Sequence, residues 1–291
     1  MLSGLEERII EKISSVGKPL KDWKIDIFRG ILTGFNEAFI ITTESKDKIL
    51  ANSPNSIEII RPILRGRDIK RYSATFCNTW LLNTHNGIKE KEIPRIDVRK
   101  DFPAVFEHLS KFRHQLETRL DKGDDWTNLR NCAYLDELEK PKIIWIELTD
   151  NASFYLDLDG YYINNTVFFL TGERLPYLTA FLNSTLTAWY FTTIAATSGM
   201  GTRRWIKMYV DQIRVPEMTP AELEAEIDSL VVNIQQGKKR GVDTKAFEQR
   251  VDELIFSLID FTQEEIEFIH SKVRENSSSG TPSHSRISHT N

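Results

Sequence analysis

The sequence predicts an α+β protein in which a mixed sheet, built from short strands with helices between them, is followed by an α-helical hairpin. Two observations lead to this prediction. Short apolar or alternating runs recur through the first 216 residues, as expected for strands. From residue 217 to residue 272 the apolar residues recur instead at three- and four-residue spacing, as expected for helices packed side by side.

The first expected element is a helix, because apolar residues recur at helical spacing from Leu5 to Val16 before Gly17-Lys-Pro19 ends the pattern. Two further helices are expected to begin near Pro103 and Pro176, since proline is favoured in the first turn of a helix. The strands are expected at residues 38–42, 79–83, 142–148, 154–156 and 161–170.

The C-terminal third has the signals of helix ends. The segment Thr219–Glu222 is a capping box, and Gly237 is expected to end the helix that it opens. Asp243 is expected to cap a second helix, and a second capping box at Thr262–Glu265 to open a short third one. After Lys272 apolar residues almost disappear, which predicts a disordered tail.

Charge differs between these parts of the chain. Residues 1–216 carry 30 Lys and Arg against 28 Asp and Glu, whereas residues 217–272 carry 6 against 13. The overall charge of −4 therefore conceals a mildly basic body, and an anionic partner has to be judged from local patches. We expect a connecting helix at 1–22, an α+β domain at 23–216, an acidic helical hairpin at 217–272 and a disordered tail at 273–291.

The first local patch is the segment 61–71, which packs five cations and one anion into eleven residues. Its apolar residues are expected to hold it against a core while the cations point outward. Lys and Arg contacts to phosphates provide most of the non-specific affinity for DNA, and Arg also reads guanine edges. The alternative is a solvated basic face paired with the protein's own carboxylates.

A second cationic segment runs from Gly199 to Lys207. Its glycines allow close backbone approach, its two arginines offer bidentate donors, and Trp205 offers a face for stacking. The alternative is a flexible loop whose tryptophan returns to the core. Two such segments, far apart in the sequence, fit a loop-built surface that reads a nucleic-acid groove better than either segment does alone.

Catalytic motifs are missing from the sequence, including dinucleotide-binding and Walker loops, a nucleophile elbow and the tetrapeptide of amino-methyltransferases. Asp68-Ile-Lys70 has the spacing of half a metal-dependent nuclease motif, but Asp68 is expected to pair with an arginine instead. Cys77 and Cys132 have no partners at metal-ligand spacing. No apolar run is long enough to span a membrane and no signal peptide is recognisable, so we expect a cytoplasmic protein without catalytic, cofactor-binding or metal residues of its own.

A series of segments, taken in order, forms a recognisable pattern: residues 29–39, 59–72, 80–82, 109–119, 126–129, 141–145, 165–169, 182–184, 251–256 and 262–266. The series covers roughly residues 23–270, and it resembles the TaqI-like C-terminal specificity domain. That domain is the target-recognition module of adenine-specific DNA methyltransferases and of single-chain (type IIG) restriction–modification enzymes.

The resemblance implies that the α+β part is a DNA target-recognition domain and that double-stranded DNA is one partner. A methyltransferase domain, in the same chain or in a separate subunit, is the other. Enzymes of this family bind S-adenosylmethionine in that domain, and the restriction types add a nuclease domain. Neither is recognisable here, so we expect either a C-terminal piece or a separate specificity subunit. The alternative is an assembly subunit that docks a catalytic partner through its acidic hairpin.

The resemblance also suggests which residues contact DNA. Gly30 and Gly34 are expected to be structural. Arg119, in the helix that begins near Pro103, lies away from both cationic segments, so its substitution is expected to leave DNA affinity nearly unchanged. The expected contact residues are Arg65, Arg67, Lys70 and Arg71 in the first segment, Arg203, Arg204 and Lys207 in the second, and Thr33 and Asn36 in the motif that begins at Arg29.

Overall fold

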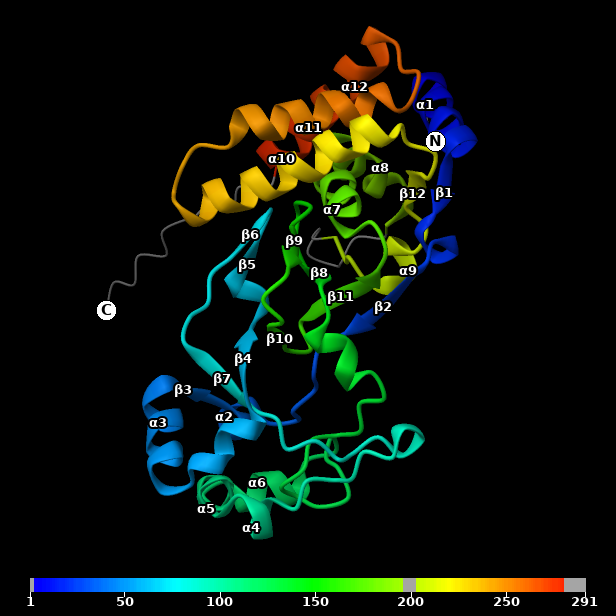
Figure 1. Ribbon diagram of the computed structural model, residues 1–291. Helices are drawn as coiled ribbons and strands as arrows, with labels where there is room; N and C mark the ends of the chain where they lie inside the picture. Colours follow the sequence, from blue (N-terminus) through cyan, green and yellow to red (C-terminus); the bar gives the residue numbers. More distant parts are fainter. Residues whose placement is uncertain (1–2, 196–202, 280–291) are drawn as a thin grey trace, which may run out of the picture.

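The centre of the molecule is a four-stranded antiparallel sheet with the strand order β2-β11-β8-β9 (Figure 1). The structure is a computed structural model that describes residues 3–195 and 203–279. The strands of this central sheet are β2 (Ile25–Arg29), β11 (Val167–Gly172), β8 (Lys142–Ile146) and β9 (Phe154–Asp157).

Each face of the central sheet belongs to a different hydrophobic core. Successive side chains of a strand point to opposite faces, so Ile143 and Phe168 enter one core while Ile144 and Phe169 enter the other. Because both faces are buried, β8 and β11 need apolar residues at almost every position. This is why they are continuous apolar runs in the sequence.

The first core lies beneath a layer of helices, which we call the helical lobe (Figure 1). A two-stranded antiparallel sheet, β1 (Gly17–Pro19) with β12 (Arg214–Pro216), lies at its side. The helices of this lobe are α1 (Gly4–Val16), α7 (Leu175–Asn183), α8 (Thr185–Ile194), α9 (Lys207–Val210), α10 (Ala221–Lys239), α11 (Lys245–Ser257) and α12 (Gln263–Ser279).

The helical lobe unites parts of the chain that the sequence patterns separate. Ile9 of α1, Leu178 of α7, Ile227 of α10 and Ile269 of α12 are all buried in its core. Residues on both sides of the expected boundaries at 22 and 216 are therefore buried in the same continuous core. The N-terminal helix and the acidic hairpin pack as parts of the body and not as appendages, because their apolar stripes have no other surface to cover.

The second core lies on the opposite face of the central sheet, in what we call the mixed-sheet lobe (Figure 1). Its sheet has the order β10-β4-β7-β3, in which β10 is parallel to β4 and the remaining pairs are antiparallel. The predicted α+β class with a mixed sheet is confirmed. The strands are β10 (Tyr162–Ile163), β4 (Ile60–Leu64), β7 (Thr79–Leu82) and β3 (Ile40–Thr42).

Short helices complete this side of the molecule, and a small ribbon packs against β9 and reaches α10 (Figure 1). The ribbon is formed by β5 (Ile69–Lys70) and β6 (Ser73–Ala74), which pair in antiparallel fashion. The α-helices are α2 (Asn36–Phe39), α3 (Thr43–Asn52), α4 (Val98–Asp101), α5 (Pro103–Ser110) and α6 (Arg113–Thr118). Among the described residues the 3₁₀ helices are η1 (Leu20–Asp22), η2 (Pro54–Ile59), η3 (Gly66–Asp68), η4 (Lys89–Lys91) and η5 (Leu135–Glu139).

Several element boundaries differ from the sequence-based expectation. The helix expected from Pro103 is two short helices, α5 and α6, and Leu120 at the end of the apolar pattern is almost fully exposed. Both helices bury their apolar residues in the same core, so the apolar spacing in the sequence continues across the break between them. The strand expected at 161–170 is β10 and β11, separated by the turn Asn164–Thr166.

The C-terminal helices also differ in their ends. Gly237 does not end α10, which continues to Lys239, and the cap residue of that helix is Pro220 without a side-chain hydrogen bond. The capping box at Thr262–Glu265 is confirmed, since each residue's side chain accepts a hydrogen bond from the other's backbone N–H. Helix α12 extends to Ser279, beyond the expected start of the tail; residues 280–291 lie outside the described residues. No described helix is both long and apolar enough to cross a membrane.

Candidate nucleic-acid interface

The first cationic segment leaves β4, turns through η3 and enters the β5–β6 ribbon. Ile63, Leu64 and Ile69 are buried in the mixed-sheet core and anchor the segment, as predicted. The turn is held by Asp68, whose Oδ2 accepts hydrogen bonds from the backbone N and the Nε of Arg65 at 2.8 and 3.2 Å. Asp68 is therefore the internal partner of an arginine, as expected.

The cations of this segment differ in how freely they face solvent. Arg65 is largely engaged with Asp68, and its side chain is only 23% exposed. The side chain of Arg67 is 71% exposed, and its Nε lies 3.9 Å from Asp68 Oδ1, too far for a hydrogen bond. Lys70, on β5, is exposed. Arg67 and Lys70 thus offer the most accessible charges.

A shallow cavity of about 390 Å³ brings the motif at Asn36 to this segment. Asn36, at the start of α2, lines it together with Arg65, Gly66 and Arg67. Thr33, by contrast, is buried, and its Oγ1 donates a hydrogen bond to Asn36 Oδ1 at 2.7 Å. The hydroxyl of Thr33 is used to hold Asn36, and a contact of Thr33 itself with DNA stays a prediction.

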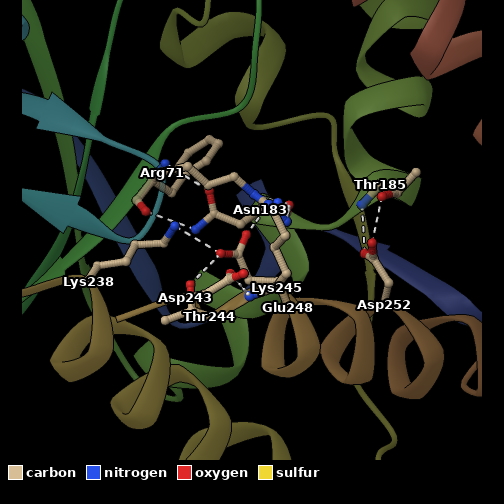
Figure 2. Close-up of polar contacts among 10 residues, drawn as sticks. Arg71, Asn183, Thr185, Lys238, Asp243, Thr244, Lys245, Glu248 and Asp252 are labelled. Carbon is tan, nitrogen blue, oxygen red and sulfur yellow. Dashed lines mark hydrogen bonds and ion pairs between the residues drawn. The ribbon is translucent and has the colours of Figure 1, made fainter. Parts of the chain in front are cut away.

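Arg71 reaches into the helical lobe, toward Asn183 and Glu248 (Figure 2). Its Nε and Nη2 donate to the backbone oxygen of Asn183 at 3.1 and 2.8 Å, and its Nη1 forms an ion pair with Glu248 of α11. The donors of the Arg71 guanidinium are thus used inside the protein, and a contact of Arg71 with DNA stays a prediction.

Glu248 is the centre of this internal network. Its Oε1 accepts from Lys238 Nζ at 2.9 Å and from Thr244 Oγ1 at 2.8 Å (Figure 2). Burial alone raises the pKa of Glu248, but the hydrogen bond from Lys238 and the charge of Arg71 outweigh it and lower the pKa. Glu248 is therefore ionised in the folded protein near neutral pH.

The second cationic segment is described from Arg203 onward, and residues 199–202 lie outside the described residues. Trp205 is 1% exposed, and its ring stacks on Phe191 with the two centroids 3.5 Å apart. Its Nε1 donates to the backbone oxygen of Thr149 at 3.1 Å. The alternative weighed from the sequence, a tryptophan that returns to the core, is the arrangement observed, so the indole is not free to stack on a base.

The buried tryptophan fixes the residues on either side of it at the surface. Arg204 pairs with Leu148 as an isolated antiparallel bridge, and its Nη2 donates to Glu147 Oε1 at 2.7 Å. Arg203 is half-buried, and its Nη1 lies 3.5 Å from the backbone oxygen of Asp150. Lys207, the first residue of α9, is exposed and pairs with Asp211 at 2.9 Å.

The turn Asn164–Thr166 contacts the first cationic segment on one side and the partner of the second on the other. On one side Gly66 lies so close that a Cβ there would be 3.0 Å from Thr166 Oγ1. On the other side the backbone N of Glu147, next to Arg204, donates to the oxygen of Thr166 at 3.1 Å. The first cationic segment and Glu147, which pairs with Arg204 of the second, therefore both contact a single turn between β10 and β11.

Two further residues reach this turn and were not singled out as contacts in the sequence. Arg29, at the end of β2, donates from Nε to the oxygen of Asn165 at 2.7 Å and from Nη2 to Glu147 Oε2 at 2.8 Å. The only signal for Arg29 in the sequence is its first place in the motif 29–39, and Glu147 carries none. Their partners lie in distant parts of the sequence, so spacing along the chain does not reveal them.

The surface around this turn has a positive net charge. We call it the junction surface and define it by Asn36, Arg65, Arg67, Arg203, Arg204, Arg29, Glu147 and Thr166. Its five arginines outnumber its one carboxylate, Glu147, even when the neighbouring Asp68 and Glu37 are counted with it. Among the described residues no cluster of three or more His, Cys, Asp or Glu side chains is placed to hold a metal ion. The surface offers hydrogen-bond donors suited to an anion.

This chain is similar to a known protein family. Residues 61–215, more than half of the chain, match the family of TaqI-like C-terminal specificity domains. The chain therefore belongs to that family. The matched range contains both cationic segments and the turn between them.

Two solved structures have the same fold. One is the type IIL restriction–modification enzyme MmeI in complex with DNA, with a TM-score of 0.64 and 12% sequence identity, over 90% of this chain and 36% of that enzyme. The other is the type IIG restriction endonuclease BpuSI, with a TM-score of 0.51 and 13% identity, over 94% of this chain and 33% of the enzyme. The chain thus spans about a third of the length of these enzymes.

Proposed function

We propose that this chain is the DNA target-recognition part of a restriction–modification enzyme and that it positions double-stranded DNA for catalytic domains that lie outside the sequence described here. The observation that supports this proposal is that the first cationic segment and Glu147, which pairs with Arg204 of the second, both contact the turn Asn164–Thr166. Membership of the specificity-domain family and the fold shared with two restriction–modification enzymes point in the same direction.

In this proposal the junction surface binds the sugar–phosphate backbone and the groove edges of the duplex. Arginine suits both tasks, because its planar group binds phosphate oxygens or the O6 and N7 atoms of guanine through two parallel hydrogen bonds. Arg67 and Lys70 are the most accessible donors of the first segment, and Arg203, Arg204 and Lys207 provide the second. Asn36 adds an amide beside Arg67.

The catalytic part of the proposal concerns a partner domain. We propose that a methyltransferase domain, in the same polypeptide or a separate subunit, binds S-adenosylmethionine and modifies the DNA that this chain selects. The chain spans about a third of the two restriction–modification enzymes that share its fold, which leaves room for such a domain. Cys77 and Cys132 are free thiols, which suits a protein of the reducing cytoplasm.

The proposal is tested by fluorescence anisotropy with a labelled duplex of random sequence. Phosphate-led binding is expected to weaken steeply between about 50 and 200 mM salt, because bound counterions are released from DNA. Arg67→Ala is expected to reduce the salt slope by about one unit. Arg250→Ala is the matched control, since Arg250 is an exposed, ion-paired arginine on α11. Binding that does not depend on salt, or no binding at all, would contradict the proposal.

A second candidate function is assembly, in which the acidic helices dock onto a catalytic partner. It is favoured by a cavity of about 640 Å³ between α11 and α12, where the apolar side chains of Phe256 and Phe261 lie beside the acidic Glu253 and Asp260. Both functions are compatible, with DNA at the junction surface and a protein at the helices. Truncation after residue 216 is unsuited to separating them, because α10 packs in the same core as α7.

Charge reversal at the helices is the better test of the assembly function. Glu253→Lys combined with Asp260→Lys leaves the core intact because Glu253 and Asp260 are exposed. If the helices dock a methyltransferase polypeptide, the double variant is expected to lose co-elution with it in size-exclusion chromatography while retaining DNA binding. Unchanged co-elution would exclude this surface as the docking site.

A further inference from the structure

Arg29 and Arg204 share one carboxylate at the centre of the junction surface. Glu147 Oε2 accepts from Arg29 Nη2 at 2.8 Å, and Glu147 Oε1 accepts from Arg204 Nη2 at 2.7 Å. We propose that these residues form one phosphate-binding unit for duplex DNA, in which Glu147 is a positioning residue that holds the two guanidinium groups side by side. This inference rests on the proposed DNA-binding function and assigns it a specific site.

The three side chains differ in their exposure to solvent, as expected for a site that is ordered before the ligand binds. The side chain of Glu147 is 12% exposed, whereas those of Arg29 and Arg204 are 51% and 49% exposed. The carboxylate therefore lies beneath the two guanidinium groups, which remain half open to solvent. A bound anion would meet the arginines and not the carboxylate.

Both arginines are held by more than the carboxylate. Arg29 Nε donates to the backbone oxygen of Asn165 at 2.7 Å, and its guanidinium lies over the ring of Phe168, 5.6 Å from the centroid. The backbone at Arg204 is fixed by its bridge to Leu148 and by the neighbouring Trp205, whose N donates to the oxygen of Glu147 at 2.8 Å. Side chains that are ordered before DNA arrives lose less entropy on binding.

Hydrogen-bonding capacity remains for a ligand. A guanidinium carries five N–H donors. Over the part of the chain that the structure describes, Nη1 of Arg29 and Nη1 of Arg204 donate no hydrogen bond to the protein. The unit also has one more positive than negative charge. A phosphate oxygen can accept hydrogen bonds from these N–H donors, and its negative charge offsets the excess positive charge of the unit.

The position of the unit explains how the two cationic segments act together. Asn165, which binds Arg29, directly precedes Thr166, which contacts Gly66 beside Arg67. The unit is thus linked through this turn to the segment that carries Arg67, and Arg203 directly precedes Arg204 in the chain. We infer that contacts to successive phosphates run continuously along this surface.

The direction in which substitution of Glu147 changes DNA affinity tests the positioning role of this residue. Glu147→Gln removes one negative charge, so long-range electrostatics alone predicts tighter binding to a random-sequence duplex. If Glu147 positions the arginines, the same variant is expected to bind less tightly, because one shared carboxylate no longer orients both of them. Glu226→Gln is the matched control: it makes the same change in a carboxylate that pairs with Arg250 on the acidic helices. It is expected to leave affinity unchanged or slightly raised.

Two arginine variants test the unit without depending on Glu147. Arg29→Ala is expected to weaken binding about tenfold, as for a lost charge-assisted hydrogen bond, and to reduce the salt slope by about one unit. Arg29→Lys keeps the charge but lacks the planar fork that spans Asn165 and Glu147, so it is expected to recover little of the lost affinity. Thermal unfolding of each variant establishes that it is folded.

The outcomes separate this inference from the proposed function. If the native chain shows no salt-dependent binding, the DNA-binding function itself fails. If the native chain binds but Glu147→Gln binds equally or more tightly than the native chain, the positioning role of Glu147 is overturned. If Arg29→Ala binds as Arg250→Ala does, Arg29 is no part of the contact surface. Should Glu147→Gln not fold, the comparison of Arg29→Ala with Arg29→Lys still decides the role of the planar guanidinium.

Discussion

Arg71 and Glu248 form an ion pair between the turn of the β5–β6 ribbon and helix α11 (Figure 2). The residues lie far apart in the sequence, and the pair connects the segment that carries Arg65 and Arg67 to the helical lobe. Asn183 at the end of α7 reinforces the connection by accepting two hydrogen bonds from Arg71. The first cationic segment is therefore held from its far end as well as from the core.

Glu248→Gln is expected to destabilise the protein near neutral pH by about 1–3 kcal/mol, because two cations lose their shared anionic partner. The folded state lowers the pKa of Glu248, so the stability it contributes is present above the unfolded pKa and is lost as pH falls through the folded pKa. The difference from the native protein should therefore shrink at a pH below about 4. Urea unfolding, followed by tryptophan fluorescence at neutral and acidic pH, measures it.

The control for this pH series is Glu107→Gln, which neutralises an exposed carboxylate on α5. It is expected to change stability by less than about 0.5 kcal/mol at either pH. An equal loss for Glu248→Gln at neutral and acidic pH would show that the carboxylate acts through packing and not through its charge.

Lys142 and Asp157 form a fully buried ion pair between β8 and β9, with Lys142 Nζ 2.6 Å from Asp157 Oδ2. Lys142→Met is expected to cost about 3–5 kcal/mol, because it leaves an uncompensated charge in the interior. The double variant Lys142→Met/Asp157→Asn is expected to lose less than the sum of the two single variants. Chemical denaturation of the four proteins measures this coupling, and strictly additive losses would contradict it.

Gly30→Ala is expected to destabilise the protein by about 1–3 kcal/mol and to weaken DNA binding as well. A Cβ at this position would overlap the backbone oxygen of Asn164, which cannot move without shifting the turn Asn164–Thr166 and the adjacent Arg29. Gly4→Ala is the control, because nothing lies within 4 Å of a Cβ there. Native-like stability and affinity of Gly30→Ala would mean that the turn yields easily.

Arg119→Ala is expected to destabilise the mixed-sheet lobe by about 1–3 kcal/mol. Its guanidinium is buried, donates to the backbone oxygens of Asp121 and Asn128, and lies 4.5 Å from the ring centroid of Phe39. Burial lowers the pKa of Arg119 to about 10. Thermal unfolding measures the loss, and an unchanged midpoint would contradict it. Arg119 is thus a poor control for DNA binding, although its sequence position suggested one, and Arg250 serves instead.

Arg65→Ala and Arg67→Ala are expected to differ in stability. Arg65 is hydrogen-bonded to buried Asp68, so its removal leaves that carboxylate without one donor and lowers stability by about 1 kcal/mol or more. Arg67 is 71% exposed, so its removal should leave stability within about 0.5 kcal/mol of the native value. Both are expected to weaken DNA binding. Equal unfolding midpoints for the two variants would contradict the structural role of Arg65.

The sequence predicts the parts of the fold that depend on local patterns. The apolar runs of β8 and β11 indicate strands, the alternation of Ile63, Leu64 and Ile69 with cations indicates an anchored basic segment, and the box at Thr262–Glu265 marks a helix start. These features follow from neighbours in the chain. Each is confirmed.

What the sequence does not provide is the set of long-range partners. Arg71 has the same local setting as Arg67, yet it reaches Glu248 on a helix that follows much later. Trp205 follows two arginines, yet it packs on Phe191 in the core. Glu147 and Arg29 meet only because β8 and β2 flank β11 in the central sheet. Such pairings are decided by topology, which spacing in a single chain does not encode.

The central sheet has a consequence for cooperativity. One face of β8 and β11 is buried in the first core, and the opposite face is buried in the second. Unfolding of either core would therefore expose one face of strands that the other core needs. Two lobes built in this way should melt in one transition, and subglobal opening of either lobe should be rare. The turn Asn164–Thr166, where we propose that DNA binds, is therefore expected to open mainly when the whole protein unfolds.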